Sequence, residues 1–340
     1  MKNIVTIGGG TGSFTLLNGL KNYNVDISAI VTMADDGGST GILRDELGVL
    51  PPGDVRQCLV ALSESSDTLR RLMNYRFEKG GLKGHNFGNL LLSTLEMTEG
   101  SFFDGLQVAS KILNIKGKVV PVSESKMHLA IELKNNQVMN GESNLDDSEE
   151  IRKIGVKKVY LSPRVKTSKL AIETIHSADL IVIGPGDHYG SIVPNLITDG
   201  ISSAIEKSKA KLVYVCNLTN KKGQTDDFDK DDYVRSINSY FGRDVVDYCL
   251  VPTGTAPKEL VERYERKEGE GSVIDFKDIK KKNRSYKIIK AKILKSNKEK
   301  NRRLFSVGHS SFIRHDSVLL AKAVIEILES LEGQVIKEVI

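Results

Sequence analysis

The 340-residue chain has 39% hydrophobic and 27% charged residues and a net charge of +5, a composition typical of soluble globular proteins. No apolar run is long enough for a membrane-spanning helix, and the first residues predict neither a signal nor a transit peptide. We therefore expect a cytoplasmic protein without a membrane span. Its three widely spaced cysteines should be buried thiols.

The N-terminal third begins with a strand, a glycine turn and a helix. The segment "KNIVTIG" predicts a buried strand, residues 15–23 predict a helix, and "DISAIVTMA" predicts the second buried strand. Residues 54–113 carry apolar side chains at three- and four-residue spacing and lack strand-like runs, which predicts several helices.

The pattern changes again after residue 117. Short strands are expected within residues 118–160, as a small β insertion with helical turns over the edge of a larger sheet. "ADLIVIGPG", "AKLVYVCNL" and "VVDYCLVPTG" then predict buried strands, each followed by a helix, and "DSVLLAKAVIEILESL" predicts the last helix. The alternation favours an α/β fold with a mostly parallel sheet and helices on both faces, in one domain over residues 1–340.

The first glycine turn lies at the carboxyl end of the first strand, where ligands of open parallel sheets gather. Bare glycines would let backbone N–H groups approach phosphate oxygens at a helix N-terminus, and the two hydroxyls would add donors. No Gly-Lys-Ser/Thr follows, and the third glycine of G-x-G-x-x-G is replaced by serine. Phosphate binding is predicted, and a tight strand-to-helix turn is the alternative. The residues concerned are Gly8, Gly9, Gly10, Thr11, Gly12 and Ser13.

Acidic residues follow the second strand and should lie beside this turn. Asp35 and Asp36 are predicted either to hold Mg²⁺ together with phosphate oxygens or to accept hydrogen bonds from a ribose. Solvated acids in a capped turn are the alternative. Further along, Asp54 is explained by helix capping, and Arg56 is a candidate phosphate clamp.

Two later polar segments also point to a ligand. A glycine-punctuated helix start presents His85, Asn86 and Asn89, which suits an anion or a base edge, although His85 could merely cap the helix. A second glycine turn follows a buried strand, and two glycine-cleared strand ends suit a ligand with two parts. Its candidate residues are Gly184, Gly186, Asp187, His188 and Ser191.

The positive charge is concentrated in residues 277–303, which hold 13 lysines and arginines against two acids, so the rest of the chain is mildly acidic. We interpret this basic segment as an edge strand with lysines facing water, followed by a solvated loop. No aromatic interleaving supports nucleic-acid binding, which we do not expect.

Several motifs in order along residues 3–330 resemble the gluconeogenesis factor family (YvcK-like), which is related in fold to 2-phospho-L-lactate transferase (CofD). They are "IGGGTGS", "ADDGGSTGILRDELGVLPPGD", "HNFGNLLL", "GPGDHYGSIVPNL", "YVCNL" and "RHD". The resemblance implies a Rossmann-like fold that binds a UDP-sugar, especially UDP-N-acetylglucosamine, at these turns. It also implies a need for the protein in cell shape and envelope synthesis during gluconeogenic growth, and hence protein partners there. We expect a homo-oligomer.

Three functions follow from these observations. The leading hypothesis is a regulator that binds a nucleotide sugar without catalysing a reaction. The alternative is a transferase, since the resemblance implies that the related branch moves a phospholactyl group from a guanosine diphospho-donor to a deazaflavin with Mg²⁺. The sequence offers acids for the metal but no assignable general base. An oxidoreductase is disfavoured by the missing third glycine, although NAD(P) stays an alternative ligand for the cleft.

Overall fold

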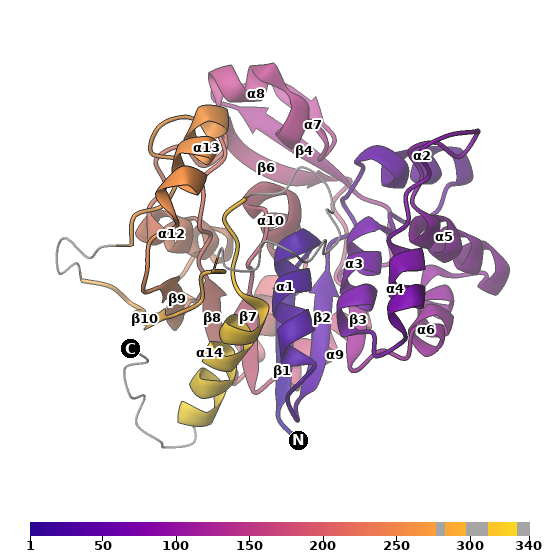
Figure 1. The fold of residues 1–340 in the computed structure, drawn as a ribbon, viewed down its shortest axis with the longest axis horizontal. Coiled ribbons are helices and arrows are strands. Elements are labelled where there is room, and N and C mark those ends of the chain that lie inside the picture. The colour runs from indigo at the N-terminus through magenta and orange to yellow at the C-terminus, as the bar shows by residue number, and fades with distance from the viewer. Residues whose placement is uncertain (277–282, 297–311, 332–340) are drawn as a thin grey trace.

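The computed structural model describes residues 1–276, 283–296 and 312–331. Its centre is a seven-stranded parallel sheet in the order β10-β9-β8-β7-β1-β2-β3 (Figure 1). The strands are β1 (Asn3–Gly8), β2 (Asp26–Val31), β3 (Lys118–Pro121), β7 (Leu180–Ile183), β8 (Lys211–Val215), β9 (Tyr248–Pro252) and β10 (Lys287–Ala291). The predicted α/β class is confirmed.

The order of the strands reverses at β1. Ile4 is in register with Ile27 of β2 on one side and with Leu180 of β7 on the other. The chain builds β1, β2 and β3 outward in one direction and then returns to add β7, β8, β9 and β10 in the other. Such a switch point opens a crevice beyond the carboxyl ends of the two central strands, where ligands of this fold class bind.

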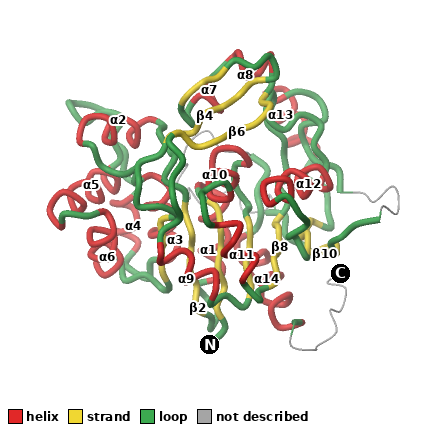
Figure 2. The backbone as a smooth tube through the Cα atoms, turned by 180° about the vertical axis from the view of Figure 1, so that it is seen from behind, coloured by secondary structure: helices red, strands yellow, loops and turns green. Residues whose placement is uncertain are grey.

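Helices cover both faces of this sheet. Figure 1 shows α1 and α14 in front of the strands, and Figure 2 shows α9 and α11 on the opposite face. The helix α1 begins at Gly10, within the glycine turn and earlier than the predicted start at residue 15. The larger helices are α1 (Gly10–Leu20), α2 (Gly38–Leu47), α3 (Gly53–Leu62), α4 (Asp67–Met73), α5 (Phe87–Glu99), α6 (Phe102–Ile112), α9 (Lys169–His176), α11 (Ile201–Lys207), α12 (Lys230–Phe241), α13 (Lys258–Glu268) and α14 (Ser317–Ser330).

A three-stranded antiparallel sheet, with the order β5-β4-β6, lies above the carboxyl ends of the large sheet (Figures 1 and 2). Its elements are β4 (His128–Leu133), β5 (Val138–Asn140), α7 (Asn144–Asp147), α8 (Glu149–Ile154) and β6 (Val156–Ser162). We call residues 128–162 the insertion. It begins later than the predicted residue 118, because β3 pairs with β2 in the large sheet and buries Val119 and Val120 there.

The core follows from the strand sequences, which are apolar on both faces because helices cover both. Ile4 and Ile7 of β1 and Leu16 and Leu17 of α1 are fully buried. The cysteines Cys58, Cys216 and Cys249 are free and buried. In the described part of the chain, no helix is both long and apolar enough to cross a bilayer.

The strand expected in the basic segment is β10, which pairs with β9 at one edge of the sheet. Lys287 and Lys290 of this strand are exposed, in keeping with a charged edge that resists pairing with another chain. Residues 277–282 and 297–303 of the basic segment lie outside the described residues.

Candidate functional site

Two glycine turns meet at the switch point. A Cβ atom on Gly12 would overlap the carbonyl oxygen of Pro185, so the turn after β1 can approach the turn after β7 only because residue 12 has no side chain. Gly10, the first residue of α1, has a φ of +62°, which favours glycine. The two turns predicted to share a ligand are therefore neighbours.

The N-terminus of α1 already faces an anion. The backbone N–H of Gly10 donates to Oδ1 of Asp54 at 2.9 Å. Asp54 does not cap its own helix as expected, because it lies in the first turn of α3 and Pro52 holds the cap position. Burial, and next the nearby Asp35 carboxylate, raise the pKa of Asp54 to about 7. Asp54 is thus a protonatable group at the place where a phosphate was predicted.

The two predicted metal-binding acids point in different directions. Asp35 accepts the Gly37 N–H at 3.0 Å and stands over Gly53 at the start of α3. Burial raises the pKa of Asp35, and Asp36 adds to that effect. Asp36 instead accepts the backbone N–H of Ser143 at 2.7 Å and so ties the insertion to the large sheet. Asp35 belongs to the cleft, whereas Asp36 is a structural tie.

The second glycine turn carries an ion pair. Asp187 accepts the Gly190 N–H at 2.7 Å and pairs with the Lys221 ammonium, which also binds Asp146 of the insertion at 2.5 Å. Burial by itself would raise the pKa of Asp187, but the Lys221 charge lowers it below its usual value. Sequence reasoning missed Lys221, since no local motif marks a loop lysine 34 residues away from its partner.

Glu142 of the insertion is a fourth acid at this site, also missed from the sequence. A Cβ atom on Gly190 would overlap its carboxylate oxygen Oε1, so the carboxyl stands directly over the second glycine turn. Burial, followed by Asp35 and Asp187, raises the pKa of Glu142 well above its ordinary value. Four carboxyl groups, those of Asp35, Asp54, Glu142 and Asp187, therefore influence one another electrostatically.

The acidic residues of the cleft offer carboxylate ligands for a cation, but they do not form a complete coordination shell. Within the described residues, no three His, Cys, Asp or Glu side chains are arranged to hold a metal ion. Mg²⁺, however, needs only one or two carboxylates when phosphate oxygens and water complete its shell. Asp54 is buried and Asp35 is half-buried, and these two carboxyl groups are the donor set that such an ion would use.

The residues predicted near the start of α5 mainly hold the structure together. Arg56 donates to Asn89 Oδ1 at 2.8 Å and to Asn74 Oδ1 at 2.6 Å, so these bonds fix its guanidinium and depart from the phosphate clamp expected. Asn86 caps α5 by accepting the Asn89 N–H at 3.2 Å. Nδ1 of His85 lies 3.3 Å from the Ser39 hydroxyl, at the margin of the cleft.

Among the remaining predicted ligand-binding residues, the two serines lie at the glycine turns, whereas His188 faces the core. Ser191 lies beside Gly9 and Gly10, and Ser13 beside Gly8. His188 departs from the prediction: its Nε2 lies 2.8 Å from Ser236 Oγ, and its ring packs against aromatic side chains. Burial lowers the pKa of His188 to about 4, so it is neutral and faces the core.

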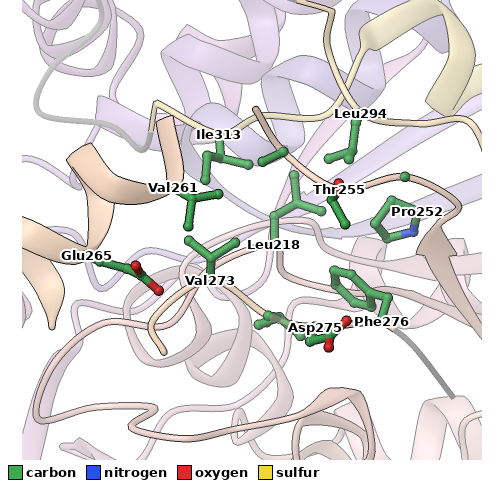
Figure 3. Close-up of a pocket in the computed structure, with 13 residues that line it drawn as sticks. Leu218, Pro252, Thr255, Val261, Glu265, Val273, Asp275, Phe276, Leu294 and Ile313 are labelled. Carbon is green, nitrogen blue, oxygen red and sulfur yellow. The ribbon is translucent and has the colours of Figure 1, made fainter. Parts of the chain in front are cut away.

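A separate apolar pocket of about 170 Å³ opens beyond the carboxyl ends of β8 and β9 (Figure 3). Its wall includes Leu218, Val261 and Phe276, and two acids, Glu265 and Asp275, also line it. Leu218 follows Asn217, whose side-chain amide donates to the Gly186 carbonyl oxygen at 2.9 Å. One wall residue of the pocket therefore directly follows, in the sequence, a residue that is hydrogen-bonded to the second glycine turn. Sequence reasoning did not find it, because its walls come from five separate segments.

Comparisons with known proteins identify the family of the chain and agree with its fold. The profile of the family described as 2-phospho-L-lactate transferase CofD matches residues 4–294. The gluconeogenesis factor of Halalkalibacterium halodurans is 43% identical over 82% of this chain and 86% of that protein. The gluconeogenesis factor of Bacillus subtilis is 39% identical over 82% of this chain and 87% of that protein. A UPF0052 family crystal structure from Bacillus halodurans has a TM-score of 0.84 at 37% identity, covering 96% of this chain and all of that one.

Proposed function

The chain belongs to the CofD family, and from this premise we propose that it binds a nucleotide sugar of the UDP-N-acetylglucosamine type. The observation that carries the proposal is the meeting of two glycine turns at the switch point of the sheet, with Gly12 against Pro185. One crevice then offers two backbone-lined ends, which suits a diphosphate with a different group on each side.

The parts of the ligand can be distributed over the site. We place the diphosphate between the turns at Gly8–Ser13 and Gly184–Ser191, and the base in the pocket beside Leu218 (Figure 3). Glu265, which lines the pocket, accepts the Gly271 N–H through Oε1 at 3.1 Å, and its second carboxylate oxygen suits the N–H donor that uracil presents. The sugar would then reach toward Asp187 and the insertion.

A diphosphate cannot enter this cleft with its charge uncompensated, because Asp35, Asp54 and Glu142 already repel one another. We propose that Mg²⁺ accompanies the nucleotide and that Asp35 and Asp54 hold it. The ion would supply the positive charge that lets carboxylates and phosphates share one site. The backbone N–H groups of the two glycine turns would then orient the diphosphate.

The regulatory role rests on the relatives, which are named gluconeogenesis factors. His188 is neutral and faces the core, so it is no candidate for proton transfer. We therefore propose a binding protein that supports cell shape during gluconeogenic growth. Expression in a Bacillus subtilis strain that lacks its own gluconeogenesis factor should restore growth and rod shape on a gluconeogenic carbon source.

A transferase is the second candidate, and the description of the matching family profile favours it. The pair Asp35 and Asp54 would suit Mg²⁺ in either function. Incubation with Mg²⁺, a phospholactyl guanosine diphospho-donor and a deazaflavin acceptor tests this candidate. The transferred phospholactyl group takes one of the donor's two phosphates, so the leaving group is GMP. Release of GMP that depends on the acceptor would replace the regulatory proposal with the transferase.

The binding proposal is tested by thermal unfolding with four ligands in the presence of Mg²⁺. A ligand at a hundredfold excess over its Kd stabilises the folded state by about 2.7 kcal/mol, or roughly a few degrees for a chain of this size. We expect UDP-N-acetylglucosamine to raise the midpoint more than UDP, and both more than GDP or NAD⁺. A dominant GDP shift would favour the transferase and a dominant NAD⁺ shift a dinucleotide site. If none of the four raises the midpoint, the proposed function is wrong.

A further inference from the structure

The insertion brings one carboxyl group into the cleft without giving it a hydrogen-bond donor. Glu142 lies between β5 and α7, and its carboxylate oxygen stands over Gly190 of the second glycine turn. Within the described residues, no hydrogen bond or ion pair to this carboxyl is found, and the residue is half-buried. Its oxygen atoms can therefore accept hydrogen bonds from a ligand in the cleft.

The other acids of the cleft are each matched. Asp54 accepts the Gly10 N–H, Asp35 accepts the Gly37 N–H, and Asp187 accepts the Gly190 N–H and pairs with Lys221. Glu142 differs from them because no donor of the described chain engages its carboxyl.

The backbone on either side of Glu142 is held in place. The N–H of Ser143 donates to Asp36 at 2.7 Å, and the carbonyl oxygen of Leu145 accepts from Gln224 at 2.6 Å. Asp146 binds Lys221 at 2.5 Å. These bonds tie the insertion to the loops after β2 and β8, which lie on opposite sides of the switch point. These hydrogen bonds and the ion pair therefore fix the position of Glu142 beside the second glycine turn.

We propose that Glu142 is a specificity-determining residue that accepts hydrogen bonds from the sugar of the bound nucleotide. This inference rests on the proposed function and names the residue that reads the non-nucleotide half of the ligand. Sugar hydroxyls and an acetamido N–H can donate hydrogen bonds to the oxygen atoms of this carboxyl group.

The experiment compares two ligands in three variants of the full chain by isothermal titration calorimetry. Glu142→Ala removes the acceptor, Glu142→Gln keeps an acceptor of the same shape, and Glu150→Gln changes an exposed acid elsewhere in the insertion. In Glu142→Ala we expect UDP-N-acetylglucosamine to bind about tenfold more weakly, since a hydrogen bond to the sugar is lost. UDP should bind within about twofold of the parent, Glu142→Gln should lose less, and Glu150→Gln nothing.

Three outcomes would overturn the inference while leaving the proposed function standing. Equal weakening of UDP and UDP-N-acetylglucosamine would mean that Glu142 acts on the nucleotide half or on folding. Weakening seen with Mg²⁺ but not with EDTA would make Glu142 a cation ligand. Unchanged affinity for both ligands would leave it without a binding role. By contrast, a parent protein that binds neither ligand would overturn the proposed function and the inference together.

Discussion

The carboxylate of Asp54 and the backbone N–H of Gly10 are joined by a hydrogen bond of 2.9 Å, across 44 residues of sequence. The bond places an acid of α3 at the positive end of the α1 dipole, where a bare glycine turn would otherwise receive an anion. The cleft is therefore a mixed site in which carboxyl groups and backbone N–H groups face the same ligand. The following predictions depend on this arrangement.

Asp54→Asn is expected to stabilise the ligand-free protein at pH 8. Because burial and Asp35 raise the pKa of Asp54 to about 7, the folded chain holds a proton that the unfolded chain, with a pKa near about 3.9, releases. The stability that this group contributes is full below about pH 4 and is lost as the pH rises to about 7. Urea unfolding should show the variant gaining about 1 to 4 kcal/mol over the parent across this range. A difference independent of pH would contradict the assignment.

Asp35→Asn and Asp36→Asn should have different effects, although the residues are adjacent. Asp35→Asn should weaken nucleotide binding about tenfold or more in Mg²⁺ and little in EDTA, because it removes a proposed ligand of the ion. Asp36→Asn should affect binding less, and lower the unfolding midpoint, because the Ser143 N–H loses a charged acceptor. Equal losses in Mg²⁺ and EDTA for Asp35→Asn would point to hydrogen bonding with the ligand instead.

Gly12→Ala should destabilise the protein more than Gly10→Ala. At Gly10 the cost is conformational, about 1 to 2 kcal/mol for a φ of +62°, since the nearest atom to an added Cβ is 3.6 Å away. At Gly12 the added Cβ would overlap the Pro185 carbonyl, so the two turns must separate and ligand binding should fall as well. Gly38→Ala, with a φ of +45° and open space, is the control. Chemical denaturation and titration calorimetry of the three variants check this order.

Lys221→Met should destabilise the protein because it leaves Asp187 buried without its counter-ion. Removing one partner of a fully buried pair costs about 3 to 5 kcal/mol; since Lys221 is partly exposed, we expect about 1 to 3 kcal/mol. The double variant Lys221→Met/Asp187→Asn should recover most of that loss, which a double-mutant cycle measures. If the losses simply add, the two side chains are not coupled.

Val261→Phe tests the pocket proposed for the base. The larger side chain on α13 should fill part of the cavity of about 170 Å³. UDP and UDP-N-acetylglucosamine should then both bind about tenfold more weakly, at an unchanged ratio, because they share the base. Val138→Phe, at an exposed position of β5, is the matched control. Parent-like affinity for both nucleotides in Val261→Phe would place the base elsewhere.

Much of the fold is readable from the local sequence. Period-two and unbroken apolar runs marked β1, β2, β7, β8 and β9, since strands covered by helices on both faces must be apolar throughout. The glycine turns were also recognisable, because glycines between a buried strand and a helix are typical of a turn at the carboxyl end of a strand in this fold class. The earlier start of α1, at Gly10, was missed because glycine has a low helix propensity, which close packing of the turn overrides.

The chemistry of the site was decided by contacts between residues far apart in sequence. Local periodicity fixes neither which strands become neighbours nor which loops meet, so nothing in the sequence separated Asp35, in the cleft, from Asp36, which binds the insertion. Asp54 was predicted to cap its own helix, and only the packing of α3 against α1 turned its carboxylate toward Gly10. No sequence motif singled out Glu142 or Lys221. Tertiary structure brought them over the second glycine turn, where burial and neighbouring charges change what a carboxyl or an ammonium group can do.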